Sequence, residues 1–205
     1  LRANKFAMLF LILSIICSVS VGVIFKVARK YSINITQIVA ANYFFALALC
    51  YFFFSLDLVT VTAQAPWAIY IPLGILLPSI FLFLAASIQH MGIVKTDAAQ
   101  RLSLFIPILA AWLIFGEQFN ALKITAFLIA FPALLLILTK PSDNTENKWV
   151  YPAVVLVGFG LIDILFKQIA LYTNLPYTTS LFVVFGIAMA IMLVVISVEI
   201  RYKKR

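Results

Sequence analysis

The chain has 205 residues, of which 65% are apolar and only 11% charged, and its formal net charge is +8. Its mean hydropathy of +1.13 is far higher than a water-exposed surface tolerates, which indicates an integral membrane protein. This excludes soluble enzymes, nucleic-acid-binding proteins and secreted disulfide scaffolds, because short connections between spans leave no room for a soluble domain. The two cysteines, Cys17 and Cys50, lie inside apolar stretches and indicate neither a disulfide nor a metal site.

Apolar runs long enough to cross a bilayer, which takes about 20 helical residues, predict seven transmembrane helices. A transmembrane barrel would alternate polar and apolar residues, whereas these runs are apolar on all sides, so the expected fold class is all-α. The runs cover about Phe6–Val27, Ile38–Ser55, Trp67–His90, Ala98–Gly116, Ala121–Leu138, Val150–Leu171 and Thr178–Val198.

The distribution of Lys and Arg predicts the orientation of these spans, because cytoplasmic loops carry the excess of positive charge. Only Arg2, Lys5 and Lys123 fall on the side of the N-terminus. The opposite side carries Arg29, Lys30, Lys95, Arg101, Lys140, Lys148, Arg201, Lys203, Lys204 and Arg205. We therefore expect the N-terminus outside and residue 205 in the cytoplasm.

A hydrophilic linker, KPSDNTENK at residues 140–148, divides the spans into five and two. Phe25-Lys26 followed by Tyr31-Ser32 recurs beyond this linker as Phe166-Lys167 followed by Tyr172-Thr173. Five spans separate the copies, so the copies must cross the membrane in opposite directions, as in the inverted repeats of secondary transporters. We expect a first repeat at 1–139 and two spans of an incomplete second repeat at 149–205. The alternative is a chance match between two aromatic-rich helices.

The segment 85–117, AASIQHMGIVKTDAAQRLSLFIPILAAWLIFGE, resembles the third and fourth spans of the EamA family in the drug/metabolite transporter superfamily. Ala98-Ala99, Pro107, Gly116 and Glu117 occupy the places of the family's short Ala-rich link, its proline and its closing Gly-Glu pair. The segment 25–46 resembles the join between the family's first two spans. The resemblance covers most of residues 6–139.

The resemblance implies a permease with ten spans in two five-span repeats, so this chain looks like a truncated copy. It also implies cytoplasmic termini, which conflicts with the charge distribution. The chain departs from the family at Asn42-Tyr43, where an arginine is frequent. No acidic residue lies between Phe6 and Val27, although the small multidrug branch has one there, so we do not expect proton-coupled export of cationic drugs.

Asp163 is the only one of the seven acidic residues placed well inside a predicted span. Lys167 lies four residues further on, which puts both side chains on one helix face with the acid N-terminal to the base. An ionised side chain facing lipid costs at least ~2.5 to 3.5 kcal/mol, so we expect both to face protein or a water-filled cavity. They are either a solute-pathway site or a mutually neutralising pair that only makes the helix compatible with lipid.

Four further residues are substrate-pathway candidates: Lys26, Gln89, His90 and Asn42. Lys26 ends its span and can equally snorkel to the interface, and Gln89 and His90 close the third span. Because His90 is the only histidine, we expect no metal site and no cofactor. Glu117 is interpreted as a structural residue at a helix end, together with Pro107 and Gly116. We expect no catalytic residues, because no histidine, serine and orienting acid come together.

The sequence therefore predicts an integral membrane protein of the bacterial inner membrane that transports small organic metabolites by alternating access. Its partners would be the lipid bilayer and a small-molecule substrate, and a homo- or hetero-oligomer is possible. The alternative is a membrane protein that does not transport, either a truncated remnant or an assembly subunit that needs a partner chain. The substrate, the coupling ion and the transport direction are not encoded in any motif of the chain.

Overall fold

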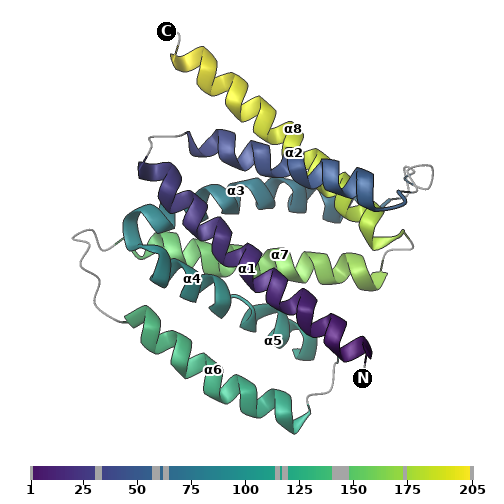
Figure 1. Ribbon diagram of the computed structural model, residues 1–205, viewed down its shortest axis with the longest axis vertical. Helices are drawn as coiled ribbons and strands as arrows, with labels where there is room; N and C mark the ends of the chain where they lie inside the picture. The colour runs from purple at the N-terminus through teal and green to yellow at the C-terminus, as the bar shows by residue number, and fades with distance from the viewer. Residues whose placement is uncertain are drawn as a thin grey trace.

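The computed structural model describes residues 2–30, 34–56, 61, 65–113, 116, 120–139, 148–172 and 175–203 (Figure 1). Every regular element in these residues is a helix and none is a strand, which confirms the all-α prediction. The helices are α1 (Arg2–Lys30), α2 (Ile35–Phe53), α3 (Trp67–Met91), α4 (Ile93–Leu102), α5 (Phe105–Leu113), α6 (Ala121–Thr139), α7 (Val150–Tyr172) and α8 (Tyr177–Lys203).

Four helices are long and apolar enough to cross a membrane: α2, α3, α7 and α8. The described parts of α1 and α6 contain shorter apolar segments, Met8–Ile24 and Ile124–Thr139. The protein is therefore embedded in a membrane. Residues 140–147 of the predicted linker lie outside the described residues, and α7 begins shortly after Lys148.

The fourth predicted span, Ala98–Gly116, differs from the structure, which has two short helices, α4 and α5, in this region. Gly92 has φ of +84°, a backbone conformation that favours glycine. This residue ends α3 and turns the chain, so α4 begins at Ile93. The break between α4 and α5 has a different cause, a proline. Pro107 lacks the N–H that would bond to Ser103 four residues earlier, and its ring clashes with that carbonyl.

Helix α3 lies at the centre of the bundle and packs against α2, α7 and α8. The contacts are close because glycines face large side chains: Gly74 of α3 faces Ile187 of α8, and Gly158 of α7 faces Ile80 of α3. Membrane helices associate through such close packing, since lipid gives no hydrophobic drive for helix contact. Helices α7 and α8, which follow the predicted linker, therefore pack directly on helices that precede it.

Successive helices run in opposite directions, except that α5 continues in the direction of α4 (Figure 1). The end of α8 meets the start of α2, where Glu199 bonds to Asn34, and the start of α7 meets the end of α3, where Tyr151 stacks on His90. The two termini consequently lie at opposite ends of the bundle. Helices α1 and α7 run in opposite directions.

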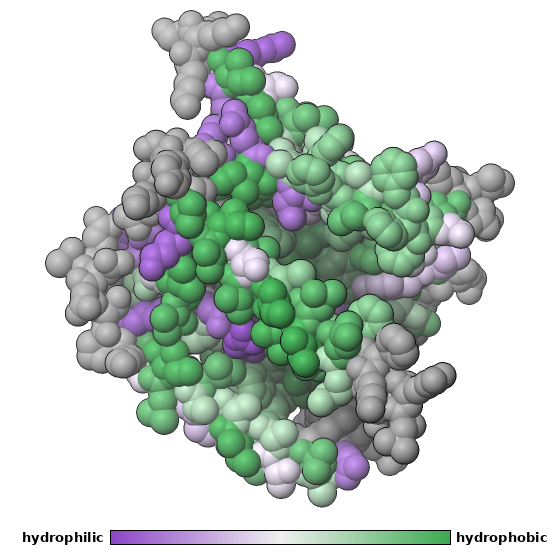
Figure 2. All heavy atoms as spheres, viewed as in Figure 1, coloured by the Kyte–Doolittle hydropathy of each residue, from purple (hydrophilic) through white to green (hydrophobic). Residues whose placement is uncertain are grey.

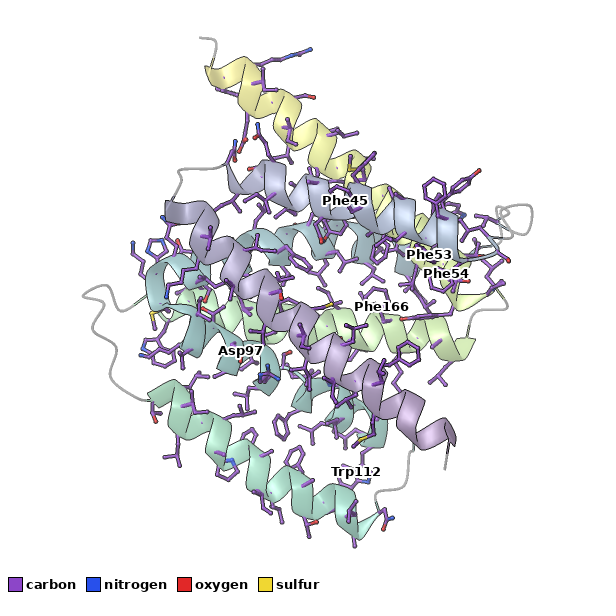
Figure 3. The ribbon with its side chains drawn as sticks, in the orientation of Figure 1. Phe45, Phe53, Phe54, Asp97, Trp112 and Phe166 are labelled. Atoms are coloured by element: carbon purple, nitrogen blue, oxygen red, sulfur yellow. The ribbon has the colours of Figure 1, made fainter. Side chains whose placement is uncertain are left out.

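Apolar side chains dominate the outer surface. Hydrophobic residues cover most of the face seen in Figure 2, with hydrophilic residues as separate spots between them. Phe45, Phe53 and Phe54 project from α2 and the residue that follows it (Figure 3), and Phe45 is 63% exposed. Such a surface suits acyl chains rather than water. The tryptophans lie at helix ends, Trp67 opening α3 and Trp149 preceding α7, as is typical of side chains at membrane interfaces.

Candidate functional site

Two cavities lie between the helices, and residues of α4 and α6 line both. The first, of about 480 Å³, is bounded by α1, α3, α4 and α6. The second, of about 620 Å³, is bounded by α4, α5, α6 and α7. Arg101 of α4 and Leu134 of α6 line both cavities. These two residues therefore lie at the boundary between the two cavities.

An ion pair marks this boundary. Arg101 donates a hydrogen bond from Nε to Oδ2 of Asp97, one turn earlier in α4, over 2.8 Å. The side chains are 42% and 40% exposed, so neither charge is fully buried. Of the two cavities, Asp97 lines only the first, and Figure 3 shows it on α4. Arg101 lies eight residues into α4, which is about 12 Å along the helix axis.

The second cavity has an aromatic and small-residue wall. The ring of Phe105 in α5 contacts Phe127 and Phe131 of α6, with centroids 4.6 and 5.2 Å apart. Ala126 and Ala130 of α6 line the cavity beside them. The small alanine side chains beside the aromatic rings leave the cavity open instead of filling it. The wall can therefore receive an apolar group of comparable size.

Lys167 of α7 also lines the second cavity and is half-buried. Asp163 is half-buried on the same helix, near Tyr177 at the start of α8. Phe166 contacts the same tyrosine, with ring centroids 6.5 Å apart. The structure therefore places Lys167 on a cavity and Asp163 beside α8. The predicted pairing of the two side chains stays a prediction.

The other pathway candidates lie away from both cavities. Lys26 of α1, Asn42 of α2 and Gln89 of α3 are exposed and belong to neither cavity lining. His90 is half-buried and stacks on Tyr151 of α7, with centroids 4.9 Å apart and ring planes 15° from parallel. Of the six candidates, only Lys167 meets a described cavity.

The residues matched to the EamA pattern have mainly structural surroundings. Pro107 lies in the first turn of α5 and also lines the second cavity. Gly116 has φ of +64° and is exposed, a backbone conformation that favours glycine. Glu117 lies outside the described residues.

Sequence reasoning missed the ion pair between Asp97 and Arg101. The predicted fourth span began at Ala98, so Asp97 fell in a connection, and the charge distribution assigned Arg101 to a membrane surface. The signal was present, because an acid four residues before a base is the same pattern that selected Asp163 and Lys167. The earlier start of α4 at Ile93 brings both residues into a helix.

A second polar cluster was also missed. Both carboxylate oxygens of Glu199 in α8 accept hydrogen bonds, Oε2 from Nδ2 of Asn34 at 3.0 Å and Oε1 from Oγ1 of Thr36 at 2.9 Å. Asn34 also caps α2 by accepting a bond from the backbone N–H of Thr36. Partners 165 and 163 positions apart give no local pattern that sequence reasoning could use.

Within the described ranges, no three His, Cys, Asp or Glu side chains are grouped so as to hold a metal ion. In the two polar clusters, Asp97 instead pairs with Arg101, and Glu199 accepts hydrogen bonds from an amide and a hydroxyl group. Their chemistry is that of hydrogen bonding and charge pairing within a membrane.

Comparison with known proteins finds a relative in Haemophilus influenzae (strain ATCC 51907 / DSM 11121 / KW20 / Rd), an uncharacterized protein that is 42% identical over 194 residues. The match covers 90% of this chain and 66% of the relative, so the chain spans somewhat less than two thirds of that protein's length. No family model matches the chain, and no solved structure is similar to it.

Proposed function

We propose that the protein is a secondary transporter, a permease of the EamA type, that moves small organic solutes across the bacterial inner membrane by alternating access. The observation that carries this proposal is the position of Arg101 at the boundary of two cavities inside an apolar bundle. Charged groups in membrane helices are costly and are typical of solute or ion pathways. A charged residue between two hollows is suited to a solute passing from one to the other.

The course of the chain supports a seven-span layout with inverted repeats. If α4 and α5 together form one broken crossing, the alternating helices cross the membrane seven times, as the apolar runs predict. Broken helices at a binding site are common in secondary transporters. The recurring motif places Lys26 near the end of α1 and Lys167 near the end of α7, and these helices run in opposite directions (Figure 1).

The positive charges support an external N-terminus. Lys95 of α4, Lys148 before α7 and Arg201 of α8 lie at the bundle end where α8 finishes and α7 starts. Arg2 lies at the opposite end with the start of α1. Under the positive-inside rule, the end with Arg201 faces the cytoplasm.

Cysteine accessibility in proteoliposomes tests whether the second cavity is aqueous. In a chain with Cys17 and Cys50 replaced by alanine, Ala126→Cys lies on the cavity wall. Leu128→Cys is the matched control, because Leu128 is 64% exposed on the same helix but is not part of the wall. A membrane-impermeant thiol reagent should label position 126 from an aqueous side much faster than position 128. Equal, slow labelling at both positions from both sides would refute a solute pathway here.

Transport itself is measured by loading proteoliposomes with a mixture of bacterial metabolites and following their efflux by mass spectrometry. Protein-free liposomes give the background. Selective loss of some solutes supports the permease. If every solute leaks at the background rate although position 126 is labelled, the non-transporting subunit becomes the better interpretation.

A further inference from the structure

We propose that the second cavity binds a small organic anion that has an apolar, ring-sized body, with Arg101 and Lys167 facing the anionic group. This inference rests on the proposed function, because it names the solute class for the same pathway.

The charged lining of the second cavity is entirely positive. Arg101 and Lys167 are its two charged residues in the described part of the wall, and no carboxylate belongs to that lining. Asp97 pairs with Arg101 from the side of the first cavity. A bound cation would therefore meet like charge, whereas an anion would meet opposite charge.

The guanidinium group of Arg101 can donate hydrogen bonds to a second acceptor besides Asp97. Its bond to Asp97 uses Nε, which is one of the five N–H donors of a guanidinium group. Hydrogen bonds between a guanidinium and a carboxylate are charge-assisted and about twice as strong as neutral ones. A solute carboxylate at the cavity boundary can therefore add to the existing ion pair without displacing Asp97.

The remaining wall fits the apolar part of such a solute. Phe105 and Phe127 present aromatic rings, and Ala126 and Ala130 leave space beside them. The volume of about 620 Å³ lies within the ~300 to 1,000 Å³ of typical small-molecule sites. The anionic group would lie toward α4 and α7, and the apolar body against α5 and α6.

The test measures binding of 2-naphthoate to the full chain in phosphatidylcholine nanodiscs by isothermal titration calorimetry. The neutral 2-naphthalenemethanol and the cationic 2-naphthylmethylamine have the same ring and serve as comparison probes. We expect 2-naphthoate to bind at least about tenfold more tightly than either, the effect of one charge-assisted hydrogen bond. Equal affinity for the three probes would overturn the proposal.

The variant Arg101→Gln should lower naphthoate affinity at least about tenfold, with little change for the alcohol. Arg201→Gln is the matched control, because Arg201 is exposed at the end of α8 and is not part of the cavity lining. If Arg101→Gln does not fold, the double variant Asp97→Asn/Arg101→Gln is used instead, because it removes both charges of the ion pair. It too should lower naphthoate affinity at least about tenfold. An unchanged naphthoate affinity in the folded variant would refute the role of Arg101.

Two further results distinguish a soluble anion from an anionic lipid headgroup, and the anion site from the transport function. Replacing part of the lipid by anionic phosphatidylglycerol should leave naphthoate binding unchanged, and competition by this lipid would overturn the assignment to a soluble solute. Naphthoate binding without metabolite efflux would refute transport and leave the anion site standing. Efflux restricted to cationic or neutral solutes, without naphthoate binding, would refute the anion site alone.

Discussion

The hydroxyl groups of Tyr70 in α3 and Ser180 in α8 lie 2.8 Å apart and share a hydrogen bond in the buried interface of these helices. Tyr43 of α2 is equally buried, but its hydroxyl has no hydrogen-bond partner among the described residues. Its ring contacts Phe81 and Phe185 instead. Two buried tyrosines of one core therefore differ in whether the hydroxyl has a hydrogen-bond partner, and each is a control for the other.

Removing each hydroxyl should change the stability in opposite directions. Tyr70→Phe leaves the Ser180 hydroxyl with only its longer bond to the carbonyl of Pro176 and should destabilise the protein by about 0.5 to 1.5 kcal/mol. Tyr43→Phe removes an unsatisfied polar atom and should be neutral or stabilising. Thermal unfolding in detergent gives both values. A lower melting temperature for Tyr43→Phe than for Tyr70→Phe would contradict the assignment of partners.

The glycines of the central interface predict a packing effect. A methyl group at Gly74 would lie 2.8 Å from Cβ of Ile187, and at Gly160 it would lie 2.7 Å from Cβ of Ile106. Gly74→Ala and Gly160→Ala should therefore each destabilise by about 1 to 3 kcal/mol. Gly186→Ala in α8 is the control, because nothing lies within 4 Å of its added carbon. An equal loss of thermal stability in all three variants would show that helix contact is not the cause.

The cluster at Glu199 predicts that the end of α8 is held on α2. Thr36→Val removes the donor to Oε1 and leaves part of a half-buried carboxylate without its bond, which should cost about 1 to 3 kcal/mol. Thr125→Val is the matched control, because the hydroxyl of Thr125 is exposed and bonds only within its own helix, to the carbonyl of Leu122. Melting temperatures that fall equally in both variants would contradict a specific role for the interhelical bond.

Composition and apolar run length predicted the helical membrane class and the bounds of six helices to within five residues. These signals work because a lipid environment forces every backbone group into internal hydrogen bonds. The fourth span was the exception. A helix that is broken at Ser103 and Leu104 keeps the same mean hydropathy as an unbroken one, so only Gly92 and Pro107 carried the signal.

The candidate site was less predictable than the fold. Lys167 could be selected because a charge inside an apolar run stands out, and it lines a cavity. Asp97 and Arg101 escaped because their segment is less hydrophobic than a usual span. Glu199 and Thr36 are 163 positions apart, and one sequence contains no information on which helices pack together. Cavity positions depend on that packing, so they follow only from the structure.

Asp163 and Lys167 give the last prediction, which separates a structural pair from a functional one. Asp163→Asn should leave the Lys167 charge less compensated and reduce folded yield, because breaking a buried charge pair costs more than removing both charges. A second change, Lys167→Gln, should restore the yield if the two side chains interact. The measurements are folded yield by size-exclusion chromatography and solute efflux from proteoliposomes for the parent, both single variants and the double variant.

Because Lys167 lines the second cavity, folded yield and solute efflux should respond differently in the double variant. We expect the double variant to recover folded yield but not efflux, because restoring the charge balance of α7 does not restore the cationic group on the cavity wall. Recovery of both would assign the pair a purely structural role in making α7 compatible with lipid. If both single variants equal the parent in yield and in efflux, neither charge is needed in the bundle, and Arg101 alone would remain as the charged group of the pathway.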